Sequence, residues 1–141
     1  MAASPVRNVL LNKAAIIERC IRRAREEYAG GGAAFEANYS RQDAAVINVI
    51  RACEASIDMG QAIMRAEKLG LNKSAGEIFD ILAQSKIVPV ALSAELKKMV
   101  GFRNIAVHQY QELDPAKVAD VLARRLDDLL EFVRVILQRE A

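Results

Sequence analysis

Apolar residues recur at spacings of three and four along most of this 141-residue chain, and this periodicity limits its fold more than any other feature. The spacing matches the 3.6-residue turn of an α-helix that places one side against a core. Val and Ile never alternate with polar residues over a window of strand length, and threonine is absent from the chain. The sequence therefore predicts an all-α fold.

Residues that start or stop helices divide the chain into five helical segments. Ser40 and Ser74 are predicted N-caps, because each precedes an acidic residue by three positions, as in a capping box. Asp114 is a further predicted N-cap, since the proline after it suits the first helical position. The glycines at 30–32 and Gly70 are predicted to end the segments before them. The predicted helices cover about residues 5–28, 40–69, 74–83, 89–110 and 114–136.

The connections between these segments are short, so neighbouring helices are expected to run antiparallel. We predict an up-and-down antiparallel bundle of four long helices and one short helix, the short one being the segment at about 74–83. One domain over residues 1–141 is expected, because the length falls within the roughly 100–150 residues common for single domains. Val46, Ile50, Cys53 and Ile57 are interpreted as core residues rather than a seam between subunits.

Composition excludes several classes of protein. Lys and Arg total 20 against 18 Asp and Glu, and a net charge of +2 is too small to predict nucleic-acid binding by itself. Cys20 and Cys53 lack the spacing of a metal site or a disulfide framework, which favours reduced thiols in a cytosolic protein. No apolar run approaches the roughly 20 residues that a membrane helix needs. We therefore expect a cytoplasmic protein without a membrane span.

The only histidine of the chain, His108, lies in a short segment with Arg103, Asn104 and Tyr110. Histidine exchanges protons near neutral pH, and the planar guanidinium of arginine binds phosphate through two hydrogen bonds. The segment is therefore a candidate site for phosphate chemistry. Too few ligands surround His108 for a metal, so neither a metal nor another cofactor is expected.

A non-functional interpretation exists for each of these residues. His108 would be a partly buried histidine with a hydrogen bond inside the bundle, and Arg103 would form an ion pair with Glu112 or an Asp of the last helix. Tyr110 would be a core aromatic residue whose hydroxyl has a partner. Asn104 would cap or bridge helices.

Helix geometry links this segment to a dimer. On a straight helix Arg103 and His108 lie roughly 140° apart, so they do not converge on one phosphate. RNA cleavage without a metal needs a base, an acid and a cation, whereas one chain has one histidine. If the chain is a nuclease, a two-fold dimer supplies both histidines, and we expect a composite site at its interface.

Arg103-x4-His108-x-Tyr110 resembles the motif of the HEPN superfamily, and its His-x-Tyr part is similar to the HepT toxins of HepT/MntA toxin–antitoxin pairs. Further segments resemble the family in the same order, among them Val100–Asn104 and Arg125–Leu129. The resemblance implies a homodimeric, metal-independent endoribonuclease with Arg103, His108 and Asn104 at its active site. It also implies the toxin of a type VII-like pair, whose partner is an MntA-like nucleotidyltransferase antitoxin that attaches AMP to Tyr110.

Further residues and functions stay open at this level. Lys97 and Lys98 are candidates for contacts with the RNA backbone, because phosphate contacts supply most sequence-independent affinity. A weak resemblance also implies that Tyr39 and Asp43 approach the motif from the second helix. The alternative function is a non-catalytic HEPN module that binds and regulates a nucleotidyltransferase. The third possibility is a structural dimerisation bundle without a ligand.

Overall fold

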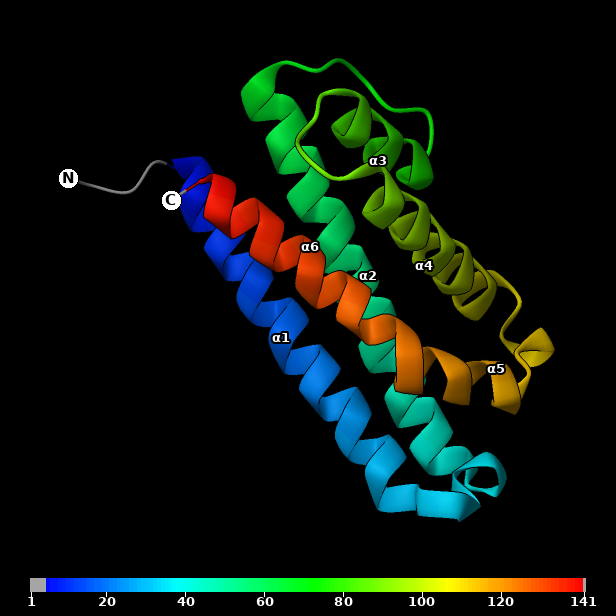
Figure 1. The fold of residues 1–141 in the computed structure, drawn as a ribbon. Helices are drawn as coiled ribbons and strands as arrows, with labels where there is room; N and C mark the ends of the chain where they lie inside the picture. Colours follow the sequence, from blue (N-terminus) through cyan, green and yellow to red (C-terminus); the bar gives the residue numbers. More distant parts are fainter. Residues whose placement is uncertain (1–4, 141) are drawn as a thin grey trace.

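The chain folds into an antiparallel bundle of helices, with no strand among the described residues (Figure 1). The computed structural model describes residues 5–140, except for the side chains of residues 32 and 33. The helices are α1 (Pro5–Gly31), α2 (Tyr39–Glu67), α3 (Ala75–Gln84), α4 (Val90–His108), α5 (Pro115–Asp120) and α6 (Leu126–Arg139). A π-helical turn at Val121–Arg125 joins α5 to α6 without a break, so these form one long helix. The predicted all-α bundle of four long helices and one short one is confirmed.

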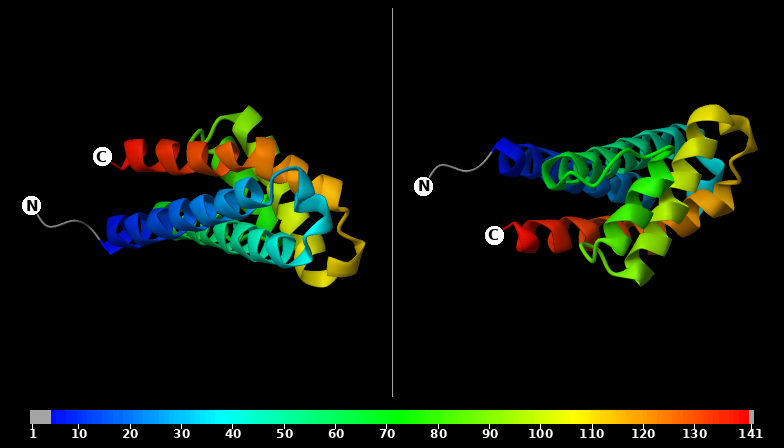
Figure 2. Two further views of the ribbon diagram at one scale, coloured as in Figure 1. Left: turned by 90° about the horizontal axis from the view of Figure 1, so that it is seen from below. Right: turned by 90° about the horizontal axis from the view of Figure 1, so that it is seen from above.

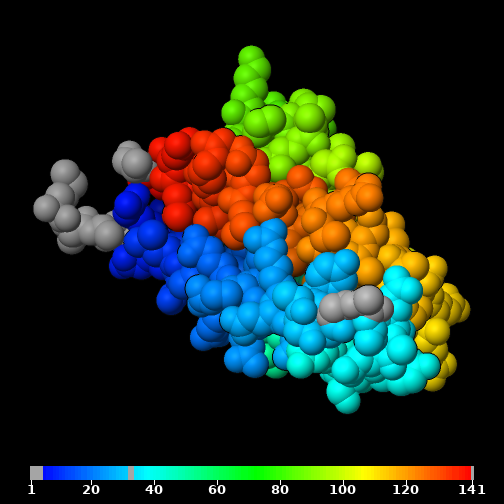
Figure 3. Space-filling model, turned by 60° about the horizontal axis from the view of Figure 1, so that its bottom comes forward, coloured from blue at the N-terminus to red at the C-terminus, as the bar shows by residue number. Residues whose placement is uncertain are grey.

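Helix α2 is the centre of the bundle, because it contacts α1, α3, α4 and α6. Figure 2 shows α1 and α2 side by side, with α6 running along them. Figure 3 shows α1 and α6 side by side on the surface. An ion pair of 2.7 Å between Arg25 of α1 and Asp127 of α6 also links these helices. The start of α1 and the end of α6 lie together, since Arg7 donates a 2.6 Å hydrogen bond to the carbonyl of Glu140. The turn after α4 is at the opposite end of the bundle (Figure 1).

The core runs along the centre of the bundle and includes the residues interpreted as core from the sequence. Val46, Cys53 and Ile57 are buried and Ile50 is partly buried. Phe79 of α3 packs edge-on against Phe132 of α6, with ring centroids 5.4 Å apart, and thereby ties the short helix to the bundle. Among the described residues, no helix combines the length and the apolar character that crossing a bilayer requires.

The first helix extends past its predicted end at residue 28. Gly30 and Gly31 are helical, and the chain then tightens into a 3₁₀ turn at Gly32–Ala37. A Cβ at Gly30 would lie 2.1 Å from an Nη atom of Arg41, so the bare glycine lets the Arg41 side chain cross the helix end. The glycines therefore allow a close approach here rather than ending the helix where the sequence predicted.

Two predicted ends of α2 are wrong by two residues. Asn38, not Ser40, is the N-cap, because its side chain accepts a 3.1 Å hydrogen bond from the backbone N–H of Arg41. At the other end the helix stops at Glu67, because the C-cap Lys68 has a left-handed backbone with φ 54°. Gly70, the predicted end, follows in the loop with φ 100°. The predicted caps Ser74 and Asp114 are confirmed, and each side chain accepts a hydrogen bond from a backbone N–H in the first turn of its helix.

Candidate active site at the end of helix α4

Helix α4 presents the predicted motif because its other side is anchored in the core. Leu96, Met99 and Phe102 are buried along that side at helical spacing. The helix ends at His108, since Gln109 has φ −139° and ψ 44° and its N–H donates a 2.7 Å hydrogen bond to the carbonyl of Ile105. Tyr110 begins a 3₁₀ turn. The prediction that the helix continues to Tyr110 is therefore wrong.

Arg103 is held between α4 and α2. Its side chain is 26% exposed, and its Nε lies 3.5 Å from a carboxylate oxygen of Glu54, without the geometry of a hydrogen bond. One Nη donates a 2.8 Å hydrogen bond to Oδ1 of the neighbouring Asn104. Arg103 therefore forms an ion pair, as its non-functional interpretation expected, but the partner is Glu54 instead of Glu112 or an Asp of the last helix. Within the described residues the second Nη has no partner, so one edge of the guanidinium remains available.

His108 is exposed at the end of α4, and its imidazole makes no hydrogen bond within the described part of the chain. The interpretation as a buried, hydrogen-bonded histidine is therefore wrong. Asn104 is also exposed, one helical turn before it. Because α4 is an uninterrupted α-helix from Val90 to His108, Arg103 and His108 point to different sides of it. One copy of the chain does not bring the imidazole and the guanidinium together.

Tyr110 returns to α2 and meets the residue that was predicted to approach it. Its hydroxyl donates a short hydrogen bond to Oδ1 of Asp43. Partial burial raises the pKa of Tyr110 to about 12, and the hydrogen bond to Asp43 and the negative charge of its carboxylate act in the same direction. The residue is 43% exposed, so its interpretation as a core aromatic is wrong.

Two shallow grooves share Asp43 and Tyr110. The first, of about 310 Å³, lies between the start of α2 and the turn after α4, and Tyr39, Gln42 and Gln111 also line it. Tyr39 therefore approaches Tyr110, as predicted. The second groove has a volume of about 550 Å³ and an apolar lining. Its other lining residues are Ala44, Val46, Ile47, Ile50 and Ala106.

The lysines predicted to contact RNA form ion pairs. Lys97 lies 3.1 Å from Asp80 of α3, and Lys98 lies 3.1 Å from Glu95. All four side chains are partly exposed, and ion pairs of this kind contribute only about 0–1 kcal/mol to stability. Contact of these lysines with RNA stays a prediction.

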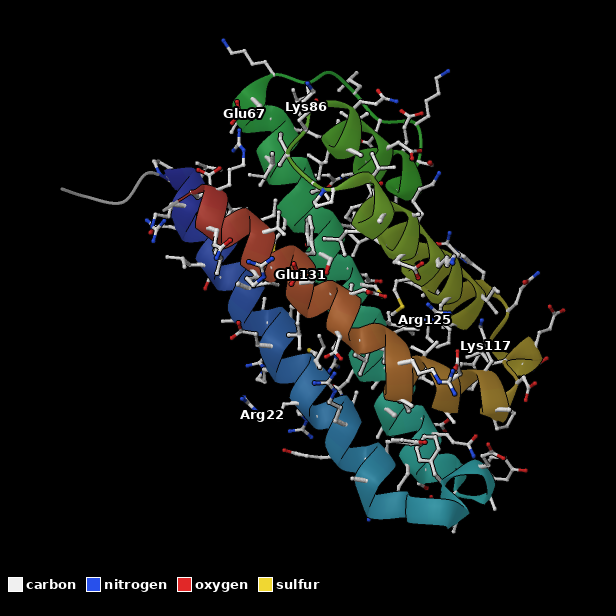
Figure 4. All side chains as sticks on the ribbon, viewed as in Figure 1. Arg22, Glu67, Lys86, Lys117, Arg125 and Glu131 are labelled. Atoms are coloured by element: carbon white, nitrogen blue, oxygen red, sulfur yellow. The ribbon has the colours of Figure 1, made fainter. Side chains whose placement is uncertain are left out.

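Sequence reasoning missed three residues that the fold brings near the motif. Glu54 pairs with Arg103, while Lys117 and Arg125, both labelled in Figure 4, border a groove of about 390 Å³ together with Lys98. Arg125 is held by a 2.9 Å ion pair with Glu95. Glu54 and Lys117 carry no local sequence signal, and Arg125 belongs to the Arg125–Leu129 segment that resembles the family. Each of the three reaches the motif from another helix, so no local pattern places it there. In the described part of the chain, no group of three or more His, Cys, Asp and Glu side chains is placed to hold a metal ion.

Residues 17–136 match the family described as Ribonuclease HepT-like. The chain belongs to the HepT-like ribonuclease family. It is 43% identical over 129 residues to the mRNA nuclease HepT of Shewanella oneidensis, an alignment that covers 92% of this chain and 96% of that protein. The predicted resemblance to the HEPN superfamily and to HepT toxins is confirmed.

Solved structures of HepT-like proteins share this fold. One is a tri-AMPylated HEPN toxin from Shewanella oneidensis in complex with its MNT antitoxin; it is 42% identical, with a TM-score of 0.87 over 92% of this chain and 97% of that chain. Another is a toxin–antitoxin with AMP-PNP; it is 41% identical, with a TM-score of 0.88 over 93% and 98%. The Bacillus subtilis protein YutE, at 21% identity and a TM-score of 0.70 over 87% of each chain, shows the fold alone.

Proposed function

We propose that this HepT-like chain is the toxin of a type VII-like toxin–antitoxin pair and an endoribonuclease that cleaves RNA without a metal. The observation that carries the proposal is the exposed His108 at the end of α4, one and a half turns after the anchored Arg103. The 43% identity to an mRNA nuclease supports RNA as the substrate class. We also propose a cytoplasmic location, which an RNA substrate and a nucleotide-dependent partner would support.

Each residue has a distinct role in the proposed reaction. The attacking 2′-hydroxyl loses a proton, the 5′-oxygen gains one, and negative charge builds on the phosphate oxygens. An imidazole can perform either proton transfer, and each transfer raises the cleavage rate by about 10²–10⁴-fold. The free edge of Arg103 neutralises the charge on the phosphate. Asn104 orients the guanidinium, because its Oδ1 accepts from one Nη. The step needs two imidazoles, and we assign them to His108 of each subunit in a homodimer.

The regular geometry of α4 supports the composite site. Arg103 and His108 of one chain point in different directions, whereas a two-fold axis near the end of α4 allows both chains to contribute residues to one site. Half-exposed apolar side chains surround this region, namely Ile47, Ile105, Val107 and Tyr110. Apolar surface of this kind favours burial against a second copy.

The partner that we propose is an MntA-like nucleotidyltransferase antitoxin, which attaches AMP to Tyr110. A similar toxin is tri-AMPylated and in complex with its antitoxin, which supports this assignment. Tyr110 lies two residues after His108 and is partly exposed, so a nucleotide on its hydroxyl would place bulk and negative charge beside the active site. Both would keep an RNA phosphate away from Arg103.

Replacing Arg103 or His108 by alanine tests the catalytic assignment. We expect each variant to cleave a messenger RNA at least about 100-fold more slowly than the wild type, because each loses a group that acts in the transition state. The matched control is Arg22→Ala, because Arg22 is an exposed arginine of α1, labelled in Figure 4. This variant should cleave RNA at the wild-type rate. Circular dichroism and size-exclusion chromatography check folding and assembly.

Several outcomes would contradict parts of the proposal. A folded Arg103→Ala or His108→Ala dimer that cleaves at the wild-type rate would remove that residue from the site. Activity that EDTA abolishes and a divalent cation restores would contradict the metal-independent mechanism. A wild-type chain that is harmless when expressed without its antitoxin and leaves RNA intact would favour the non-catalytic binding module.

A further inference from the structure

The hydrogen bond between Tyr110 and Asp43 joins the turn after α4 to the first turns of α2. We propose that the Asp43 carboxylate accepts the phenolic proton when Tyr110 attacks the α-phosphorus of a nucleoside triphosphate. The toxin would then carry the base for its own modification, and the partner would supply the nucleotide. This inference rests on the proposed function, since it takes Tyr110 as the acceptor of AMP.

Asp43 is suited to take a proton. Among the described residues its carboxylate has no cationic partner, and Tyr110 is the side chain that occupies it. Arg41, nearby on α2, instead pairs with Glu27 at 3.4 Å. Asp43 is also exposed, so a proton that it accepts can pass to water.

A comparison of the three tyrosines shows what sets Tyr110 apart. Tyr39 is 74% exposed and lines the same groove, yet its hydroxyl has no hydrogen-bonding partner among the described residues. Tyr28 packs edge-on against Phe35, with ring centroids 5.1 Å apart. Exposure alone would select Tyr39 for modification. The carboxylate at the hydroxyl selects Tyr110.

The reaction balances with the groups named. The Oη of Tyr110 forms a bond to the α-phosphorus, the bond from that phosphorus to the bridging oxygen breaks, and pyrophosphate leaves. The phenolic proton passes to Asp43 and then to solvent. With a pKa of about 12, the phenol is almost fully protonated at neutral pH, so it must lose its proton during the attack. A positioned general base typically contributes about 10²–10⁴-fold to such a step.

The test measures transfer of AMP by mass spectrometry, with the full chain, its nucleotidyltransferase partner and ATP. Asp43→Asn keeps an oxygen that accepts the phenolic hydrogen bond but has little basicity, and we expect modification to slow by about 100-fold or more. Asp43→Glu restores a carboxylate and should recover part of the rate. Tyr110→Phe should not be modified.

Two matched controls should be modified at the wild-type rate. Tyr39→Phe removes the neighbouring hydroxyl in the same groove, and Asp58→Asn removes another carboxylate of α2, which pairs with Lys13 at 3.0 Å. Circular dichroism confirms that each variant is folded. If Asp43→Asn is modified at the wild-type rate while Tyr110→Phe is not, Asp43 is not the base and the acceptor assignment stands. If Tyr110→Phe is still modified, the acceptor assignment itself fails.

Discussion

Cys53 lies inside the bundle, where its thiol donates a 3.7 Å hydrogen bond to the backbone carbonyl of Met99. Only 2% of the residue is exposed. Burial raises the pKa of the thiol to about 12, although the positive charge of Arg103 acts in the opposite direction. The thiolate is the nucleophilic form, so the folded protein keeps Cys53 unreactive at neutral pH.

We therefore expect iodoacetamide at pH 8 to leave Cys53 unmodified in the native protein and to alkylate it once urea unfolds the chain. The physical reason is that the folded state both covers the sulfur and disfavours its ionised form. Peptide mass spectrometry after labelling at several urea concentrations measures the change. Rapid alkylation without urea would contradict the buried position.

At the scale of single residues, the motif could be found from the sequence but its contacts could not. Arg103, Asn104, His108 and Tyr110 lie within one short segment, and their chemistry is evident from residue type. The partner of Arg103 is Glu54, and that of Tyr110 is Asp43, which only a resemblance had suggested. Both partners belong to α2, and no local pattern encodes which turn of that helix faces α4.

At the scale of the element, α2 and α3 approach closely at Gly60. A Cβ built there would lie 2.5 Å from the Cγ2 atom of Ile78, which is fully buried. Gly101 of α4 has nothing within 4 Å of the corresponding position. The two glycines are both helical and differ in the space around them.

We expect Gly60→Ala to lower the free energy of unfolding by about 1–2 kcal/mol, because overpacking against Ile78 outweighs the better helix propensity of alanine. Gly101→Ala is the matched control and should raise it by roughly 0.5–1 kcal/mol, since alanine is the better helix former and meets no neighbour there. Urea denaturation at equal protein concentrations measures both. A stabilised Gly60→Ala protein would show that α3 moves away without cost.

The helices themselves could be predicted well, and their ends less well. Ser74 and Asp114 cap helices as expected, whereas Asn38 replaces Ser40 at the start of α2. Asn38 and Ser40 are both acceptable N-cap residues, so propensity alone does not choose between them. Burial of Phe35 and the 2.8 Å hydrogen bond from Gln42 to its carbonyl hold the turn that makes Asn38 the cap.

At the scale of the whole molecule, α2 contacts both α1 and α4. Its residues Glu54 and Asp43 contact Arg103 and Tyr110 of the proposed site. Arg103, His108 and Tyr110 all lie in the last turns of α4 or just after it, at the end of the bundle away from the chain termini (Figure 1). The proposed second subunit would therefore face this end of α4.

Heterodimers of wild-type and His108→Ala subunits test the shared site. With two differently tagged chains and two affinity steps, we expect the purified heterodimer to lose at least about 100-fold in RNA cleavage, because one site needs both histidines. A heterodimer with an Arg22→Ala subunit should stay fully active. Half of the wild-type activity in the first heterodimer would show that each chain has a complete site, and a protein that is monomeric when active would exclude the shared site.

The sequence by itself determined the helical class, the approximate helices, the family and the segment that we propose as the active site. These features follow from local causes, namely side-chain periodicity, caps and the residue types in one short motif. Only the tertiary structure decided that α4 stops at His108, that Glu54 faces Arg103 and that Asp43 meets Tyr110. Those contacts depend on how α2 and α4 pack, and packing between segments far apart in the chain sums many weak interactions that no local pattern records.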